Sequence, residues 1–219
     1  MKLETWLRLA DIPYTIAAPD FNVAPKGKIP YVDDAGALMG DSTLIIEHLI
    51  ATRGRDPDAG LSREERAISV AFRRLCKENL YWVTLKMRYS DPHNWSLYRP
   101  VLAGMQTTAP PDVKLAIADT IYRNMIEQLQ NQGLGRHSLE EVDRIGMADL
   151  TALSDFLGAK PFLMGDRPTS VDATAYSHVA NTIEVPLQST VRDHGRALPN
   201  LVAYCERMRE RFFPDLPRA

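Results

Sequence analysis

Asp41 and Ser42, which follow Gly40, stand where an apolar helix containing Leu44 and Leu49 is predicted to begin. The first turn of a helix presents free backbone N–H groups and a positive dipole, so this position suits the carboxylate of a ligand. The Ser42 hydroxyl adds a hydrogen-bonding group, and the Asp41 carboxylate can accept a hydrogen bond from an ammonium. The alternative is that Asp41 or Ser42 only caps the helix. Both roles are compatible with the sequence.

The other reactive side chains form no recognisable catalytic or metal-binding pattern. The five histidines lack a His-Glu-x-x-His or similar ligand spacing, so no metal site is predicted. Gly133-Leu134-Gly135 follows a predicted helix, not a strand, and therefore does not indicate a nucleotide-binding loop. Cys76 and Cys205 each fall in a helical apolar pattern. This predicts free buried thiols and a reducing, cytoplasmic setting.

The composition limits the classes of partner. The chain has 219 residues and 45% apolar content, with 26 Lys and Arg against 28 Asp and Glu for a net charge of −2. No segment concentrates basic residues, which disfavours nucleic acid and anionic membranes as partners. We also expect no membrane span and no signal peptide, because the apolar runs are short and no charged-then-apolar leader is found.

Two kinds of local pattern divide the chain. The first part has short, mixed elements: a helix over 2–10, a strand over 14–17, a hairpin pairing 29–32 with 37–39, and the helix that follows Ser42. Residues 51–61 have the composition of a linker. The rest reads as helical, with predicted helices at 62–90, 112–132, 139–158, 169–183 and 199–212. We therefore predict domains at 1–50 and 62–219.

This order of elements, together with four motifs, resembles the glutathione transferases, and more closely their branch of failed-axon-connections and metaxin-like proteins. The resemblance implies an α/β thioredoxin-like N-terminal domain followed by an all-α C-terminal helical domain. The motifs cover nearly the whole chain and are Pro25-Lys26-Gly27-Lys28-Ile29-Pro30-Tyr31, Gly40-Asp41-Ser42, Gly133-Leu134-Gly135-Arg136-His137-Ser138 and Gly165-Asp166-Arg167-Pro168-Thr169-Ser170-Val171-Asp172.

The resemblance also implies a glutathione site. Ile29 and Pro30 match a cis dipeptide whose exposed backbone pairs with the cysteinyl unit of glutathione. Asp41 and Ser42 match the acidic-Ser pair that holds the γ-glutamyl end. Lys28, and less directly Lys26, could reach the glycyl carboxylate. The alternatives are an ordinary trans Ile29–Pro30 bond and exposed lysines with no ligand.

Other matching residues are given structural roles. Thr169 and Asp172 match the N-capping box of a buried helix, with no part in catalysis. Arg136 and His137 belong to a branch motif for which a capped helix start is the conservative interpretation. In transferases the end of the first long helix borders the substrate cleft, but helical spacing favours the core for five residues there. They are Tyr81, Trp82, Met87, Arg88 and Tyr89.

The family's catalytic Tyr, Ser or Cys comes from an initial strand and loop, and no residue here matches it. We therefore expect an incomplete first domain that lacks the first strand, no catalytic residue, and weak or no glutathione binding without conjugation. Two functions stay open: a glutathione-dependent transferase or thiol enzyme in its full-length form, and a non-catalytic binding or scaffold protein of the metaxin-like kind. The ligand expected is a small-molecule thiol, glutathione as substrate, and a homodimer stays open.

Overall fold

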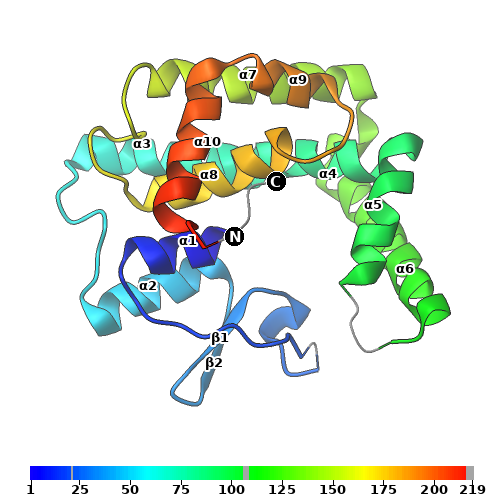
Figure 1. Cartoon of the computed structure of the whole chain (residues 1–219), viewed down its shortest axis with the longest axis horizontal. Helices are drawn as coiled ribbons and strands as arrows, with labels where there is room; N and C mark the ends of the chain where they lie inside the picture. The colour runs from blue at the N-terminus through cyan, green and yellow to red at the C-terminus, as the bar shows by residue number, and fades with distance from the viewer. Residues whose placement is uncertain (21, 106–108, 216–219) are drawn as a thin grey trace.

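The computed structural model describes residues 1–20, 22–105 and 109–215. Figure 1 shows the elements near the two ends of the sequence lying side by side, with α1 and α2 beneath a large group of helices and a small hairpin at the bottom. The N-terminal part consists of α1 (Lys2–Leu9), β1 (Tyr31–Asp34), β2 (Ala37–Gly40) and α2 (Ser42–Arg53). Helix α2 continues three residues into the predicted linker before Gly54 ends it in the left-handed conformation.

The predicted hairpin is present, shifted by about two residues on its first strand. Strands β1 and β2 pair antiparallel, with Tyr31 opposite Gly40 and Asp34 opposite Ala37. Ala35 and Gly36 form the turn at φ 55° and 90°. Positive φ at both turn positions matches the right-handed twist of the flanking strands. The Asp33 carboxylate closes the turn by accepting from the Gly36 N–H at 2.6 Å.

The predicted strand at 14–17 is wrong. In the described part of the chain the sheet contains β1 and β2 alone, and residues 14–17 have no regular secondary structure. Their β-branched and aromatic composition favours an extended chain, but a strand also needs a neighbour to pair with. Without that neighbour Ile16 is 79% exposed.

The helical part confirms the predicted helices and adds two. Residues 63–89 form one continuous rod of α3 (Arg63–Arg74), a π-helical segment (Leu75–Leu80) and α4 (Tyr81–Tyr89). The other predicted helices are α6 (Pro111–Gln132), α7 (Leu139–Leu157), α8 (Ser170–Ile183) and α10 (Pro199–Phe212). The additional ones are α5 (Pro92–Gly104) and α9 (Thr190–Arg196). The Asp91 N-cap and Pro92 at the first turn were a signal for α5 that Pro100 obscured.

Two cores of unequal size hold the chain together. The larger core lies within the helical part and includes Leu80, Leu150 and Met208. The smaller core joins α1 to α2, and Ala173 of α8 belongs to it. Trp6 is fully buried there, and its indole Nε1 donates to Ser170 Oγ at 3.0 Å. Helix α8 is therefore the surface on which the N-terminal part is built.

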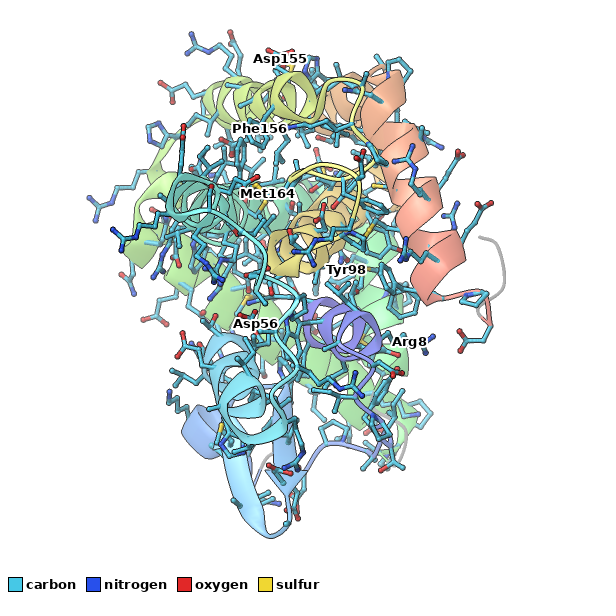
Figure 2. The ribbon with its side chains drawn as sticks, turned by 90° about the vertical axis from the view of Figure 1, so that its left-hand side faces the viewer. Arg8, Asp56, Tyr98, Asp155, Phe156 and Met164 are labelled. Atoms are coloured by element: carbon cyan, nitrogen blue, oxygen red, sulfur yellow. The ribbon has the colours of Figure 1, made fainter. Side chains whose placement is uncertain are left out.

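Arg8 fastens α1 to the C-terminal end of the described chain. Its Nη1 donates to the Phe212 carbonyl and to Asp215 Oδ1, each at 2.7 Å. The guanidinium carbon also lies 4.5 Å from the centre of the Phe213 ring. Figure 2 shows Arg8 projecting from α1 below the end of α10. The first and last helices are thus joined directly.

Three helices begin with a capping box, at Ser62 with Glu65, Ser138 with Glu141, and, as predicted, Thr169 with Asp172. The third is buried. Asp172 accepts from the Thr169 N–H at 2.8 Å, from the Leu163 N–H at 2.9 Å and from the Tyr204 hydroxyl at 3.1 Å. Its role is structural, because it links the start of α8 to α10 and to the preceding loop.

Candidate functional site

A cleft of about 730 Å³ separates the N-terminal part from the helical part. One wall comes from the first turns of α1, from residues 14–17 and 29–32, and from Ser42. The opposite wall comes from one face of α4 and from the second half of α8. Because these segments are remote in sequence, the cleft exists only in the folded chain.

The structure places the predicted dipeptide on the cleft. The Ile29–Pro30 bond is cis, as predicted. Both residues line the cleft, and Ile29 is 55% exposed. Its backbone precedes β1 and is free of the hairpin ladder, which begins at Tyr31. Lys28 is exposed but is not among the residues that line the cleft.

Asp41 and Ser42 differ in their positions: Asp41 caps a helix, whereas Ser42 lies on the cleft. Asp41 is the N-cap of α2: its Oδ1 accepts from Thr43 N at 2.7 Å and from Leu44 N at 3.4 Å. Burial opposes ionisation of this carboxyl, but the two N–H donors and the nearby Lys77 charge outweigh it and lower its pKa. Asp41 adopts φ 71°, a left-handed backbone that is uncommon outside glycine. Ser42 lines the cleft, whereas Asp41 does not.

Two lysines that no sequence pattern singled out lie at the same helix start. Lys2 Nζ donates to Ser42 Oγ at 3.1 Å, and Lys77 Nζ donates to Thr43 Oγ1 at 3.1 Å. Burial, reinforced by the Lys77 charge, lowers the pKa of Lys2 to about 8. These two cations outnumber the single Asp41 carboxylate at the helix N-terminus, so the potential there is positive. The carboxylate of a ligand would reduce the electrostatic repulsion between the two lysines.

The helical wall corrects part of the prediction for the end of the long helix. Met87 and Tyr89 are buried, as predicted. Tyr81 and Arg88, seven residues apart on one face of α4, line the cleft instead. The prediction for all of these residues rested on the same helical spacing. Spacing alone cannot show which face of α4 packs into the core and which lines the cleft.

His178 on α8 faces Tyr81 across this wall, with ring centres 6.3 Å apart. Its Nδ1 lies 2.8 Å from the Thr174 carbonyl, which fixes that nitrogen as the protonated one in a neutral ring. Burial lowers its pKa, and the charges of Lys2 and Lys77 act in the same direction. His178 is therefore neutral near pH 7 and contributes a polar, uncharged edge to the cleft.

The remaining motifs and thiols lie away from this chemistry. Gly135 packs so closely on α6 that a Cβ would come within 2.5 Å of Leu129, and its carbonyl accepts from Lys86 Nζ at 2.8 Å. The motif at 133–138 is thus a structural junction. Cys76 and Cys205 are free and buried, and burial raises the pKa of both thiols. In the described ranges no three metal-ligating side chains gather, and no helix has the length and apolarity to cross a membrane.

Comparison with known proteins identifies similar chains. A family model described as the glutathione S-transferase N-terminal domain matches residues 1–94, and one for the C-terminal domain matches residues 146–208. An isoprene-epoxide–glutathione S-transferase of Rhodococcus sp. (strain AD45) is 38% identical over 192 residues, which cover 86% of this chain and 79% of the relative. Failed axon connections of Drosophila melanogaster is 29% identical over 98% of this chain. This chain spans about half of that relative's length, 54%. Mouse metaxin-1 is 29% identical over 87% of this chain and 62% of the relative.

Solved structures give the same architecture. A β-etherase from Sphingobium sp. strain SYK-6 matches with a TM-score of 0.61 at 16% identity, over 98% of this chain and 94% of the other. A glutathione transferase of Bombyx mori matches with a TM-score of 0.54 at 18% identity, over 97% and 83%. These likenesses show the fold: a thioredoxin-like N-terminal part followed by an all-helical part, as predicted.

Proposed function

Because the chain belongs to the glutathione S-transferase family, we propose that it binds glutathione in the cleft and that the protein in its full-length form serves glutathione-dependent transferase or thiol chemistry. The observation that carries the proposal is the convergence of the Ile29 backbone, Ser42 and Lys2 on one cleft. Relatives that include Failed axon connections and metaxin-1 agree with the predicted branch.

The geometry orients the tripeptide. The γ-glutamyl carboxylate lies at the start of α2, where it accepts from the Ser42 hydroxyl and from Lys2, which is charged when an anion is present. The cysteinyl unit pairs with the free backbone at Ile29, as an added strand would. Asp41 caps the helix through Oδ1, which accepts from the N–H groups of Thr43 and Leu44, and the contact of its carboxylate with the γ-glutamyl ammonium stays a prediction. Lys28 does not line the cleft, and its contact with the glycyl carboxylate stays a prediction.

Calorimetric titration of glutathione into the whole chain tests the proposal. We expect Ser42→Ala and Lys2→Met each to weaken binding by about tenfold, the loss typical of one hydrogen bond to a charged group. Ser96→Ala and Lys114→Met are matched controls, because neither residue lines the cleft. Equal affinity in all five proteins, or no binding to the wild type, contradicts the proposal.

A second function, a binding or scaffold module, is favoured by a different observation. Residues 14–17 have no strand partner among the described residues, and Ile16 is 79% exposed. An unpaired extended segment is a place where another chain can add. The same titration separates the two functions: a folded wild-type chain that ignores millimolar glutathione supports the module. The reducing, cytoplasmic setting remains part of the proposal, and the two free thiols are compatible with it.

A further inference from the structure

Arg88 has hydrogen-bonding capacity that the protein does not use. Its Nη2 donates to the Asn181 carbonyl at 2.9 Å and to Asn181 Oδ1 at 3.2 Å. Its guanidinium carbon lies 5.3 Å from the centre of the Tyr98 ring. The buried Nε has no acceptor among the described residues. Asn181 and Tyr98 therefore hold the group in place on the cleft wall without neutralising it.

No carboxylate compensates this cation. Within the described part of the chain, none forms an ion pair with Arg88. Glu4 is the acidic residue among those that line the cleft. It is already engaged by Arg8 at 3.2 Å and by the Tyr14 hydroxyl at 2.8 Å. A partly buried charge without a partner is costly, so an anion brought by a ligand would be favoured here.

The surroundings of Arg88 define the rest of that ligand. Leu85 and Tyr81 share its face of α4, and Leu3 and Leu7 of α1 line the same cleft. An apolar body would be received by these side chains while its charged end meets the guanidinium. Glutathione, in the proposed orientation, uses Ser42 and Lys2 on the other wall.

We propose that Arg88 is the anion-binding residue for a second ligand of the cleft, a small organic carboxylate with an apolar body. The division of the cleft into a glutathione part and a second-ligand part rests on the proposed function. The binding of a carboxylate by Arg88 rests on the contacts of Arg88 alone.

The test compares two probes of the same shape, 4-phenylbutanoate and its neutral amide, by calorimetry with the whole chain at pH 7. The acid is ionised there, because ordinary carboxyl pKa values are near 4 to 5. We expect the carboxylate to bind about tenfold or more tightly than the amide, in line with a charge-assisted hydrogen bond. Equal binding of the two probes overturns the proposal.

Variants assign the preference to a residue. Arg88→Gln is expected to abolish the preference for the carboxylate over the amide, and Arg88→Lys to keep part of that preference. Arg123→Gln removes the same charge from an exposed position that does not line the cleft, and is expected to keep it fully. If Arg88→Gln does not fold, as judged by circular dichroism, the comparison of the two probes in the wild type and in Arg88→Lys still decides. A preference that survives in folded Arg88→Gln overturns the proposal.

Glutathione titration of the same proteins separates this inference from the proposed function. Arg88→Gln is expected to bind glutathione as the wild type does. If it loses glutathione affinity instead, Arg88 belongs to the glutathione part and the second-ligand assignment is wrong. If the wild type prefers the carboxylate, Arg88→Gln does not, and neither protein binds glutathione, the proposed function fails while the Arg88 site stands.

Discussion

The two walls of the cleft rest on very different foundations. The helical wall, α4 and α8, is part of a continuous core in which side chains such as Leu80, Val83 and Val179 are fully buried. The N-terminal wall is made of the first turns of α1, the start of α2, loops and part of a two-stranded hairpin, and exposes Ile16 and Ile29. Its small core is completed by Ala173 of α8.

The N-terminal part therefore depends on the helical part for its stability, and not the reverse. A two-stranded hairpin has little stability alone, and a few buried side chains on α1 and α2 supply little more. The glutathione side of the cleft should therefore open before the helical side does. Substitutions in each part test this order of opening.

The largest effect is expected from Asp172→Ala in the helical part. The substitution removes the acceptor for four hydrogen bonds, from Leu163 N, Thr169 N, Thr169 Oγ1 and Tyr204 Oη. Buried donors left without an acceptor should lower the free energy of unfolding by about 4 kcal/mol. Urea denaturation followed by circular dichroism measures this loss.

Asp155→Ala is the control for Asp172→Ala. Asp155 is exposed on α7, on the side of the molecule far from the hairpin (Figure 2), and should change the unfolding free energy by less than about 0.5 kcal/mol. Because α8 supports both cores, Asp172→Ala should weaken the amide protection of both parts together. Loss of protection in the helical part alone would contradict the dependence proposed here.

A smaller effect is expected from Trp6→Phe, at the contact between the parts. Phenylalanine keeps most of the apolar volume but cannot donate to Ser170 Oγ. We expect a loss of about 2 kcal/mol. Hydrogen exchange should show it as faster exchange in α1 and α2, with the helical part nearly unchanged. Trp95→Phe, in the separate α5–α6 cluster, should leave α1 and α2 unchanged, and equal changes in both parts would argue against an ordered opening.

The smallest effect is a pH dependence confined to the helical part. Burial raises the pKa of Asp149 to about 6, although Asn79 Nδ2 donates to it at 2.8 Å. The native state therefore binds this proton more tightly than the unfolded chain does, so this group's contribution falls as pH rises from about 4 through 6. Asp149→Asn, whose carbonyl can still accept from Asn79, should stabilise the chain by about 1 kcal/mol at pH 7.5 and much less at pH 4.5. A gain that is the same at both pH values would show that ionisation is not its cause.

Local chemistry in the sequence was enough to predict much of the fold. Capping boxes, prolines at helix starts and helical apolar spacing predicted α7, α8 and α10, because these signals act within a few residues. The cis Ile29–Pro30 bond, by contrast, was implied by the resemblance to the glutathione transferases and not by the dipeptide itself. These local rules missed α5, a helix that continues through Pro100 and packs against α6.

Tertiary structure alone decided the rest of the site. Lys2 meets Ser42 forty residues away, and Arg88 meets Asn181 across two helices. The sequence determined that Arg88 would lie on a helix, but not that its face would turn toward the cleft while Tyr89 turned inward. It determined an extended tendency at 14–17, but not whether a neighbour would pair with it. Side-chain spacing is a property of one segment, whereas burial, pairing and charge compensation depend on what other segments bring to the same place.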